Sequence, residues 1–191
     1  MRIGEARRAQ IVAAAREICL EKGFARMTVS DITNRANMTR SLFYHYFPGK
    51  EEVADAVLDD VIDEILARLR AWNESREPGN TAKSLDDVIA LIHVVLDEDG
   101  PFHNQLVQAG NAQMYIRFID RASDRIADYF CDTVVRDFER DHGPVPFTNV
   151  HETFVVLIIG LISLIRSHPD VSDATVRAVA AQTLHLEDYL R

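Results

Sequence analysis

Hydrophobic side chains recur every three to four residues along almost the whole chain of 191 residues, and this periodicity restricts the fold more than any other feature. A spacing near 3.6 residues places apolar groups on one face of an α-helix, whereas a half-buried strand alternates with a period of two. No strand–turn–strand pattern is evident in the sequence. Clusters such as Pro48-Gly49 and Gly143-Pro144-Val145-Pro146 interrupt the periodic segments. The sequence therefore predicts an all-α protein of roughly nine helices.

These breaks divide the chain into a head of three short helices and a larger helical body. In the head we expect helices at about 5–21, 28–36 and 39–47. A long helix then starts at Lys50 and carries an apolar stripe to Trp72, before a linker-like break at Asn73–Ser84. In the body we expect helices at about 85–98, 102–110, 112–141, 150–167 and 172–190. We predict a domain of residues 1–50, a linking helix at about 50–73 and a second domain of residues 51–191.

The composition excludes several classes of protein. Hydrophobic residues make up 47% of the chain and charged residues 27%, as in soluble globular proteins. The longest apolar run, Phe154–Ile165, spans twelve positions, fewer than the roughly 18 that a membrane crossing requires. Arg16 and Glu17 interrupt the first apolar stretch, which argues against a signal peptide. With two cysteines and no pattern of disulfides, the sequence indicates a cytoplasmic protein.

The charges are distributed unevenly along the chain, although the formal net charge is −9. Residues 1–50 contain nine Lys and Arg against four acids, a balance of +5, whereas residues 51–191 contain twelve against twenty-six, a balance of −14. Because salt screens charges over about 8 Å, a phosphate responds to the face that it touches rather than to the whole molecule. A basic head on an acidic body is expected where one end meets nucleic acid, but chance variation gives the same pattern.

Two short helices joined by a tight turn, within this basic segment and after a supporting helix, form the pattern of a helix-turn-helix. The second helix must bury one face and present the opposite face to the major groove of DNA. Phe43 and Phe47 lie four residues apart on the side expected to face the core. The opposite side offers a guanidinium, two hydroxyls and an imidazole and no acid, from Arg40, Ser41, Tyr44 and His45. The predicted partner is therefore double-stranded DNA.

Four stretches of the head occur together in the order and at the spacing of one known family: Gly23-Phe24, Thr28 to Ala36, Met38 to Phe47, and Lys50-Glu51-Glu52-Val53. Through them, residues from about 7 to 65 resemble the tetracycline-repressor (TetR) family of bacterial transcription regulators. The resemblance implies a helix-turn-helix head joined by a long helix to a helical effector-binding and dimerisation body. It also implies a ligand-responsive regulator, usually a repressor, that binds a palindromic operator as a homodimer and is released by a small molecule.

The resemblance also assigns roles to single residues of the head. Tyr44 and Lys50 become contacts to DNA phosphates, and Thr28 and Thr39 become helix caps near the DNA backbone. The remaining contacts, to bases or phosphates, fall on Arg40, Ser41, Leu42 and His45. Each assignment has a plainer alternative, namely an ordinary surface or half-buried side chain.

The head departs from the family pattern at the turn and in the helix after it, where Phe43 stands in place of the family's Leu. Asn37 stands where the family usually has a turn glycine, and asparagine tolerates positive φ better than most residues. Ser41 and Leu42 stand where the family often has Gly-Thr. Leu42 either meets a thymine methyl group or packs beside the core of the head, so the base that is read stays open.

The body contains a helix that is apolar on every side. Thr153–Ile165 has no Lys, Arg, Asp or Glu, so this helix needs neighbours all round, from its own domain or from a second copy. In the TetR family the last two long helices usually pair with their mates in a four-helix bundle. The resemblance therefore implies a homodimer interface with the candidates Phe154, Ile158, Leu161, Ile165, Val176, Val179 and Leu184. Alternatively, residues 153–165 form only the central core helix of the body.

A second stretch without charged residues, Gly100–Ile116, is rich in amide side chains. Uncharged polar groups among apolar ones are typical of small-molecule pockets. The candidate effector site comprises His93, His103, Gln105, Gln108, Gln113, Met114 and Phe118. The alternative is that these groups are surface amides or bind neighbouring helices. The sequence does not identify the effector.

The sequence offers little support for an enzyme. Glu139 and His142 have the Glu-x-x-His spacing of a di-iron bundle, but that chemistry needs two such motifs, and no other histidine follows a glutamate by three residues. No phosphate-binding loop, nucleophile elbow or Cys-x-x-Cys motif is present. We expect no catalytic residue, no metal and no cofactor. Two other hypotheses stay open: a helical ligand-binding or interaction homodimer that does not bind DNA, and an all-α metalloenzyme.

Overall fold

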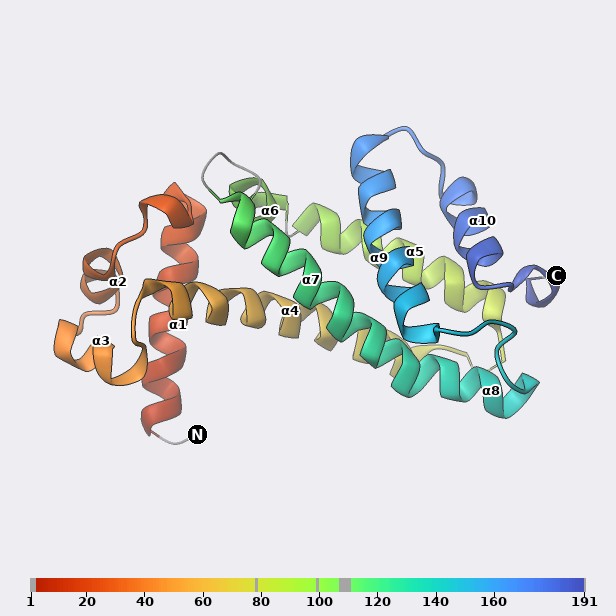
Figure 1. Cartoon of the computed structure of the whole chain (residues 1–191), viewed down its shortest axis with the longest axis horizontal. Coiled ribbons are helices and arrows are strands. Elements are labelled where there is room, and N and C mark those ends of the chain that lie inside the picture. Colours follow the sequence, from red (N-terminus) through yellow and green to blue (C-terminus); the bar gives the residue numbers. More distant parts are fainter. Residues whose placement is uncertain (1–2, 78, 99, 107–110, 191) are drawn as a thin grey trace. The chain divides into compact units, whose positions relative to one another are not determined.

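A computed structural model of the chain describes residues 3–77, 79–98, 100–106 and 111–190 (Figure 1). Within these ranges every regular element is helical, which confirms the predicted all-α class. The described chain divides into two compact units, one made of Met1–Glu64 and Glu98–Phe118, the other of Ile65–Asp97 and Ile119–Arg191. The predicted head lies in the first unit, which also includes the start of the long helix and residues 98–118.

The first unit begins with α1 (Ile3–Lys22), a short 3₁₀ turn η1 (Phe24–Arg26), α2 (Val29–Arg35) and α3 (Arg40–Tyr46). It also holds the first half of α4 (Lys50–Ser75), the short α6 (Gly100–Leu106) and the start of α7 (Ala112–Phe130). Its core is apolar: Ile11, Ile18, Ile32 and Phe43 are fully buried. Each such side chain contributes about 1.5–3 kcal/mol when removed from water, so this core holds the three head helices together.

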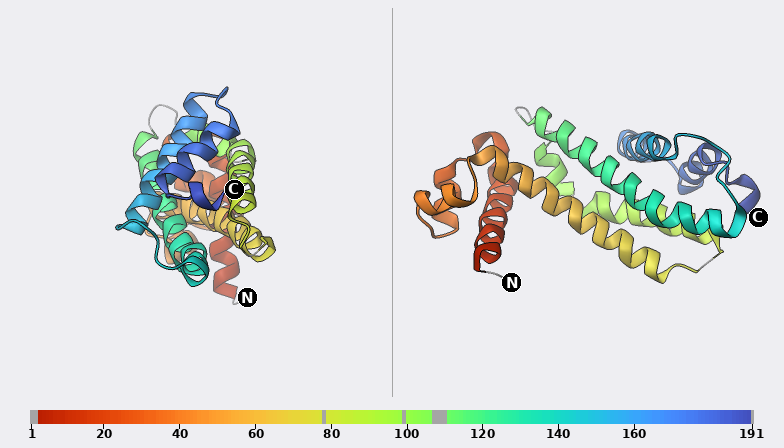
Figure 2. Two further views of the ribbon diagram at one scale, coloured as in Figure 1. Left: turned by 90° about the vertical axis from the view of Figure 1, so that its right-hand side faces the viewer. Right: turned by 60° about the horizontal axis from the view of Figure 1, so that its bottom comes forward.

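The second unit contains the end of α4, then α5 (Thr81–Glu98) and the greater part of α7. A π-helical turn η2 (Cys131–Val135) joins α7 to α8 (Arg136–His142), so the helical backbone is continuous from Ala112 to His142. The chain continues with α9 (Val150–Ser167), α10 (Asp173–Thr183) and a 3₁₀ turn η3 (Glu187–Tyr189). Figure 2 shows α9 and α10 side by side, in agreement with the contacts between them.

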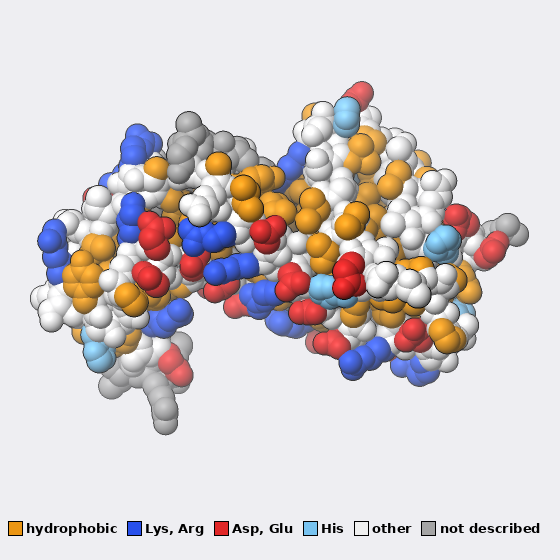
Figure 3. All heavy atoms as spheres, viewed as in Figure 1, with side chains coloured by type: hydrophobic (Ala, Val, Ile, Leu, Met, Phe, Trp, Pro, Cys, Tyr) orange, Lys and Arg blue, Asp and Glu red, His pale blue; other side chains and the backbone are white. Residues whose placement is uncertain are grey.

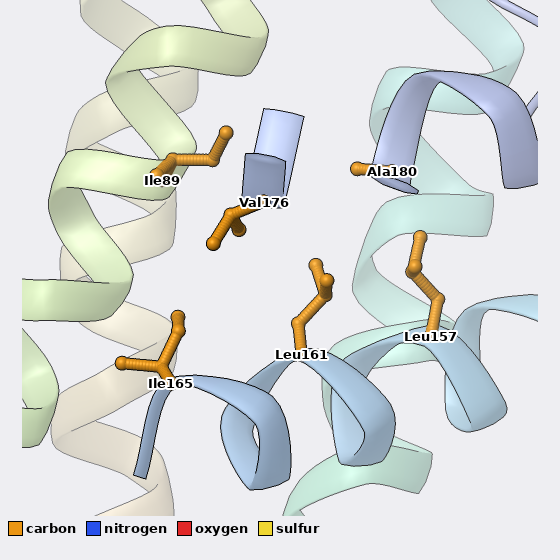
Figure 4. Packing of buried hydrophobic residues seen from close by; sticks show 6 residues of the cluster. All are labelled: Ile89, Leu157, Leu161, Ile165, Val176 and Ala180. Atoms are coloured by element: carbon orange, nitrogen blue, oxygen red, sulfur yellow. The ribbon is translucent and has the colours of Figure 1, made fainter. Parts of the chain in front are cut away.

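An apolar cluster holds the last two helices against α5. Ile89 comes from α5, Leu157, Leu161 and Ile165 come from α9, and Val176 and Ala180 come from α10 (Figure 4). All of them are buried, and Val176 is fully buried. Phe154 of α9 stacks on Phe130 of α7, with ring centroids 5.3 Å apart. One face of α9 thus forms part of the core of its own unit.

Two predicted boundaries in the body are wrong, each for a local reason. Helix α5 begins at Thr81 rather than near 85, because Asn80 caps it: the Lys83 N–H donates to Asn80 Oδ1 over 3.0 Å. Helix α10 ends at Thr183 rather than 190, since His185 adopts a positive φ of 53°. The helix expected at 112–141 is present as a continuous helical segment, with the π turn Cys131–Val135 within it. Of the helix expected at 102–110, residues 107–110 lie outside the described part.

Helix α9 has a mean hydropathy of 1.7 over its 18 residues, and by length and composition alone it would suit a membrane crossing. The core helix of a soluble protein has the same composition, and 22% of the residues of α9 are buried inside the chain. The remaining side chains include Val156 and Ile159, which are exposed. The apolar character of α9 therefore has two components, a buried face and an exposed face.

Candidate nucleic-acid interface

The start of α2 is fixed by a reciprocal cap between Thr28 and Asp31. The Asp31 N–H donates to Thr28 Oγ1 over 3.2 Å, and the Thr28 N–H donates to Asp31 Oδ2 over 2.9 Å. Lys22 at the end of α1 pairs with the same carboxylate over 2.8 Å. The hydrogen bonds from Lys22 and Thr28 lower the pKa of Asp31 to about 2, so this carboxylate is ionised at neutral pH. The role of Thr28 as a cap is thereby confirmed.

The turn between α2 and α3 uses the asparagine that replaces the usual glycine. Asn37 has a φ of 48°, in the left-handed region that asparagine enters at low cost. The Met38 N–H donates to the Thr33 carbonyl over 3.0 Å, which closes the turn. Gln10 of α1 donates to the carbonyl of Ala36 over 2.9 Å, so the supporting helix also holds the turn. This contact was not predicted because the two residues are 26 positions apart.

Helix α3 buries one face and exposes the other, as a recognition helix must. Thr39 caps it by accepting the N–H of Leu42 over 3.2 Å, and Phe43 is fully buried. On the opposite face lies Tyr44, whose large aromatic side chain is 55% exposed. The other exposed residues of this face are Arg40, Ser41 and His45, whereas Leu42 is half-buried. The intermediate position of Leu42 leaves both of its proposed roles open.

The basic residues of the head fall into two electrostatic groups. Arg35 lies between Glu17 and Glu21 at 3.0 and 2.7 Å, and these carboxylates raise the pKa of its guanidinium. Its pairing also lowers the pKa of Glu21. Arg16 pairs in the same way with Asp60 and Glu64. These cations are neutralised within the protein and have little charge left for an external anion.

Arg40 and Lys50 belong to the second group. The Arg40 guanidinium donates to the hydroxyl of Ser30, and the Lys50 ammonium donates to the Met27 carbonyl over 3.3 Å. Both partners are neutral, and within the described residues neither cation has a carboxylate at ion-pair distance. An approaching phosphate therefore meets an uncompensated positive charge at each position. A shallow open depression at the turn between α2 and α3 is lined by Thr33, Asn34, Asn37, Met38 and Thr39.

The candidate dimer residues occupy different environments. Phe154, Leu161, Ile165 and Val176 are buried within their own chain, so their side chains are not available to a second copy. Ile158 and Leu184 are half-buried, and Val179 is 37% exposed. The outward face of α9 instead carries Val156 at 69% and Ile159 at 36% exposure, with Gly160 and Ser163 on the same stripe. Figure 3 shows hydrophobic side chains over α9, with acids and bases gathered over α7 and α8.

The candidate effector residues mostly bind protein neighbours. The His93 ring contacts Asp173 over 2.9 Å, Gln105 donates to the Leu20 carbonyl over 3.0 Å, and Phe118 packs edge-on against Phe102. Met114 is buried and Gln113 is exposed. Gln108 and the side chain of His103 lie outside the described residues. Sequence reasoning had no local signal for the partners of Gln105, because the contact joins residues 85 positions apart.

The head is similar in sequence to known proteins. Residues 11–57 match a family described as bacterial regulatory proteins, tetR family. The HTH-type transcriptional regulator EthR of Mycolicibacterium smegmatis is 39% identical over 59 residues, 31% of this chain and 27% of EthR. The uncharacterized HTH-type transcriptional regulator TtgW of Pseudomonas putida is 32% identical over 124 residues, 58% of this chain and 91% of TtgW. The HTH-type transcriptional repressor KstR2 of Mycobacterium tuberculosis is 30% identical over 101 residues, 53% of this chain and 48% of KstR2.

Solved structures extend the likeness over almost the whole chain. A TetR-family transcriptional regulator from Streptomyces coelicolor superposes with a TM-score of 0.63 at 17% identity, covering 96% of this chain and 98% of the other. The regulator FadR from Bacillus subtilis in complex with stearoyl-CoA gives a TM-score of 0.56 at 17% identity, covering 93% and 96%. At such identities the likeness is one of fold. Among curated relatives, the chain spans only 27% of EthR of M. smegmatis and 55% of SrpR of P. putida.

Proposed function

The chain belongs to the TetR family of helix-turn-helix transcription regulators, and from this premise we propose that it is a ligand-responsive repressor that binds a palindromic operator as a homodimer. The observation that carries the proposal is the outward face of α3, where Arg40, Ser41, Tyr44 and His45 are exposed without an acid among them. This face suits a DNA major groove, because guanidinium and hydroxyl groups pair with base edges and phosphates there. The basic head and the likeness to KstR2, a repressor, support the same function.

In the proposed complex, different residues of the head set the affinity for DNA and the specificity for its sequence. Lys50 and Tyr44 contact phosphates, which sets the affinity and its dependence on salt. Arg40, Ser41, Leu42 and His45 lie toward the base edges. Arg40 exchanges its hydrogen bond with Ser30 for one to a guanine or a phosphate, and this exchange is inexpensive because the serine hydroxyl is neutral. Thr28 and Thr39 hold the ends of α2 and α3 next to the DNA backbone.

We place the homodimer interface on the outward stripe of α9 together with Val179 of α10. Val156 and Ile159 are exposed apolar residues that a second copy would cover. Gly160 follows Ile159 on the same stripe, and a Cβ built there would meet nothing within 4 Å. A small residue on an exposed helical face lets a second helix approach closely. This placement replaces Phe154, Leu161, Ile165 and Val176, whose side chains stabilise the protomer itself.

A small-molecule effector would act by shifting the population of protein conformers. If the effector prefers a conformer that does not fit the operator, the operator affinity falls, at most by the ratio of the effector's affinities for the two conformers. FadR from B. subtilis is described in complex with stearoyl-CoA, which is consistent with effectors in this fold but does not identify one for this chain. The proposed protein acts in the cytoplasm, where its operator lies, and needs no catalytic residue, metal or cofactor.

The test is DNA binding by the full chain. A binding selection on random-sequence duplexes, followed by fluorescence anisotropy with the enriched duplex, measures the Kd at 50, 100 and 200 mM salt. We expect a palindromic consensus and a Kd that rises steeply with salt, because phosphate contacts release counterions. If no sequence is enriched and no duplex binds at 50 mM salt, the alternative of a helical ligand-binding homodimer without DNA binding replaces this proposal.

A further inference from the structure

A buried polar cluster lies within the first unit where α6 and α7 meet the end of α1. Its centre is Asn111, which is only 4% exposed although it precedes a helix and carries a polar side chain. The Ala25 N–H in η1 donates to Asn111 Oδ1 over 3.0 Å, and Asn111 Nδ2 donates to the Gln105 carbonyl over 2.7 Å. The Gln105 amide in turn donates to the Leu20 carbonyl at the end of α1 over 3.0 Å. Two of these hydrogen bonds therefore connect Asn111 and α6 to η1 and α1, and the third joins Asn111 to α6.

The packing around these hydrogen bonds is tight. A Cβ built on Gly23 would lie 3.2 Å from Asn111 Nδ2 and 3.2 Å from Gln105 Oε1, and the φ of Gly23 is +78°. Only glycine combines that backbone conformation with so close an approach. Phe24 packs edge-on against Phe102 of α6, with ring centroids 6.1 Å apart. The cluster is therefore closely packed rather than an incidental surface contact. Below, "the joint" means the contacts among Leu20, Ala25, Gln105 and Asn111.

One feature of the joint leaves it short of maximal stability. Gln105 Oε1 is buried, and no donor among the described residues reaches it. A buried acceptor without a partner has lost its bonds to water and gained nothing in return. An arrangement in which this oxygen is paired would therefore be more favourable at this point than the one observed.

Asn111 also begins α7. Its carbonyl accepts the N–H groups of Met114 and Tyr115 over 2.9 and 3.0 Å, so the same residue starts this helix and holds Ala25. Helix α7 runs without a break to Phe130, which belongs to the second unit. In the first unit Arg117 of α7 also pairs with Asp55 of α4 over 2.8 Å. A displacement along α7 therefore reaches the residues that precede Thr28, the cap of α2.

We propose that Asn111 is a positioning residue for operator binding, because it fastens the start of α7 to the corner between α1 and α2. The inference rests on the proposed function and adds a route by which the body sets the position of the head. With the joint closed, each head is held at one position relative to α7, and the two heads of a dimer meet both half-sites together. With the joint open, the heads gain freedom that DNA binding must remove, and the affinity for the whole operator falls.

The test compares Asn111→Ala with the parent protein on two duplexes, the selected palindrome and a duplex with one half-site. A single half-site needs only one head, so we expect equal Kd values for parent and variant there. On the palindrome we expect the Kd of the variant to rise by about 5- to 30-fold, in the usual range of coupling between sites. The salt slope stays unchanged, because no phosphate contact is removed. Hydrogen exchange of the Ala25 amide accelerates at least about tenfold.

Asn104→Ala is the matched control, since Asn104 is an exposed asparagine on α6, next to Gln105. It should bind both duplexes as the parent does. Should Asn111→Ala fail to fold, Gln105→Ala removes the hydrogen bond to Leu20 together with the unpaired Oε1 and keeps the carbonyl that binds Asn111. Because this variant loses one of the two hydrogen bonds to α1 and η1, it should weaken palindrome binding in the same sense. Equal palindrome affinity in parent and variant overturns the inference, as does an equal loss on both duplexes, which would mean a damaged head. A parent protein that binds no duplex refutes the proposed function instead, and the exchange of Ala25 still reports on the joint.

Discussion

At the scale of single residues, the partners of the basic side chains matter more than their number. Arg35 and Arg16 are each shared between two carboxylates, whereas Arg40 and Lys50 bind a hydroxyl and a carbonyl. The sequence gives all four the same charge. Which of them keeps its charge available depends on acids up to 48 positions away, and a local motif does not contain that information.

Substituting Lys50 and Arg40 in turn should separate affinity from specificity. Lys50→Ala is expected to weaken binding to every duplex by a similar factor and to reduce the salt slope by about one unit, because one phosphate contact is lost. Arg40→Ala is expected to relax the preference at one base pair, at a cost of about 1–3 kcal/mol on the preferred duplex. Anisotropy titrations with the selected duplex and its single-base variants measure both effects.

Lys83→Ala is the control for these substitutions, since Lys83 pairs with Asp87 on an exposed face of α5 in the second unit. Its salt slope should match that of the parent. If Lys50→Ala and Arg40→Ala both bind like the parent at all salt concentrations, the DNA contacts assigned to α3 and the start of α4 are wrong.

At the scale of helices, the sequence predicted those features that arise from neighbours in the chain. The caps at Thr28 and Thr39, the positive φ of Asn37 and the helix at 150–167 depend on a few consecutive residues and were anticipated. Asn80 is also a local cap, but it follows Pro78-Gly79 and was taken for part of a linker.

The neighbours of α9 and of Asn111 could not be predicted from the sequence pattern. A helix that is apolar all round does not reveal which side meets its own core, because that depends on α5 and α10. An amide in an uncharged stretch equally suits a ligand or a distant backbone group, and in Asn111 the partner is Ala25, 86 positions earlier. Contacts between residues far apart in the sequence determine the buried side of α9 and the partner of Asn111, and only the three-dimensional structure shows such contacts.

The outward face of α9 leads to a prediction about oligomeric state. Val156→Glu should raise the dissociation constant of the homodimer by at least about 100-fold, or about 2.8 kcal/mol, because a carboxylate would be buried without a partner in the interface. The protomer should stay folded, since Val156 is 69% exposed in the single chain. Light scattering during size-exclusion chromatography measures the mass, and circular dichroism checks the helix content.

Ala71→Glu introduces the same charge at an exposed site on α4 and should leave the mass unchanged. A dimer that survives Val156→Glu at low micromolar concentration would contradict the placement of the interface on this face. A parent protein that is monomeric would contradict the dimer itself.

At the scale of the whole molecule, two continuous helices, α4 and α7, connect the two units. The charges follow the same division in part, with a basic segment at 1–50 and an acidic remainder. Such a protein attracts DNA to one end, while the acidic remainder disfavours non-specific contact elsewhere. We expect the proposed pairing of two copies to set the separation of their heads, rather than the DNA.

This expectation gives a prediction about the spacing of half-sites. The centres of the half-sites in the selected duplex should lie about 34–36 Å apart, or a multiple of that, because both heads must reach the same face of the DNA. Inserting five base pairs turns one half-site to the opposite face, and inserting ten restores the face but adds one helical turn. With fixed heads, both insertions should reduce the affinity to that of a single half-site. Fluorescence anisotropy measures the Kd of each of the three duplexes. If the duplex with ten inserted base pairs keeps full affinity, the two heads move independently. In that case no displacement of α7 controls the distance between the heads.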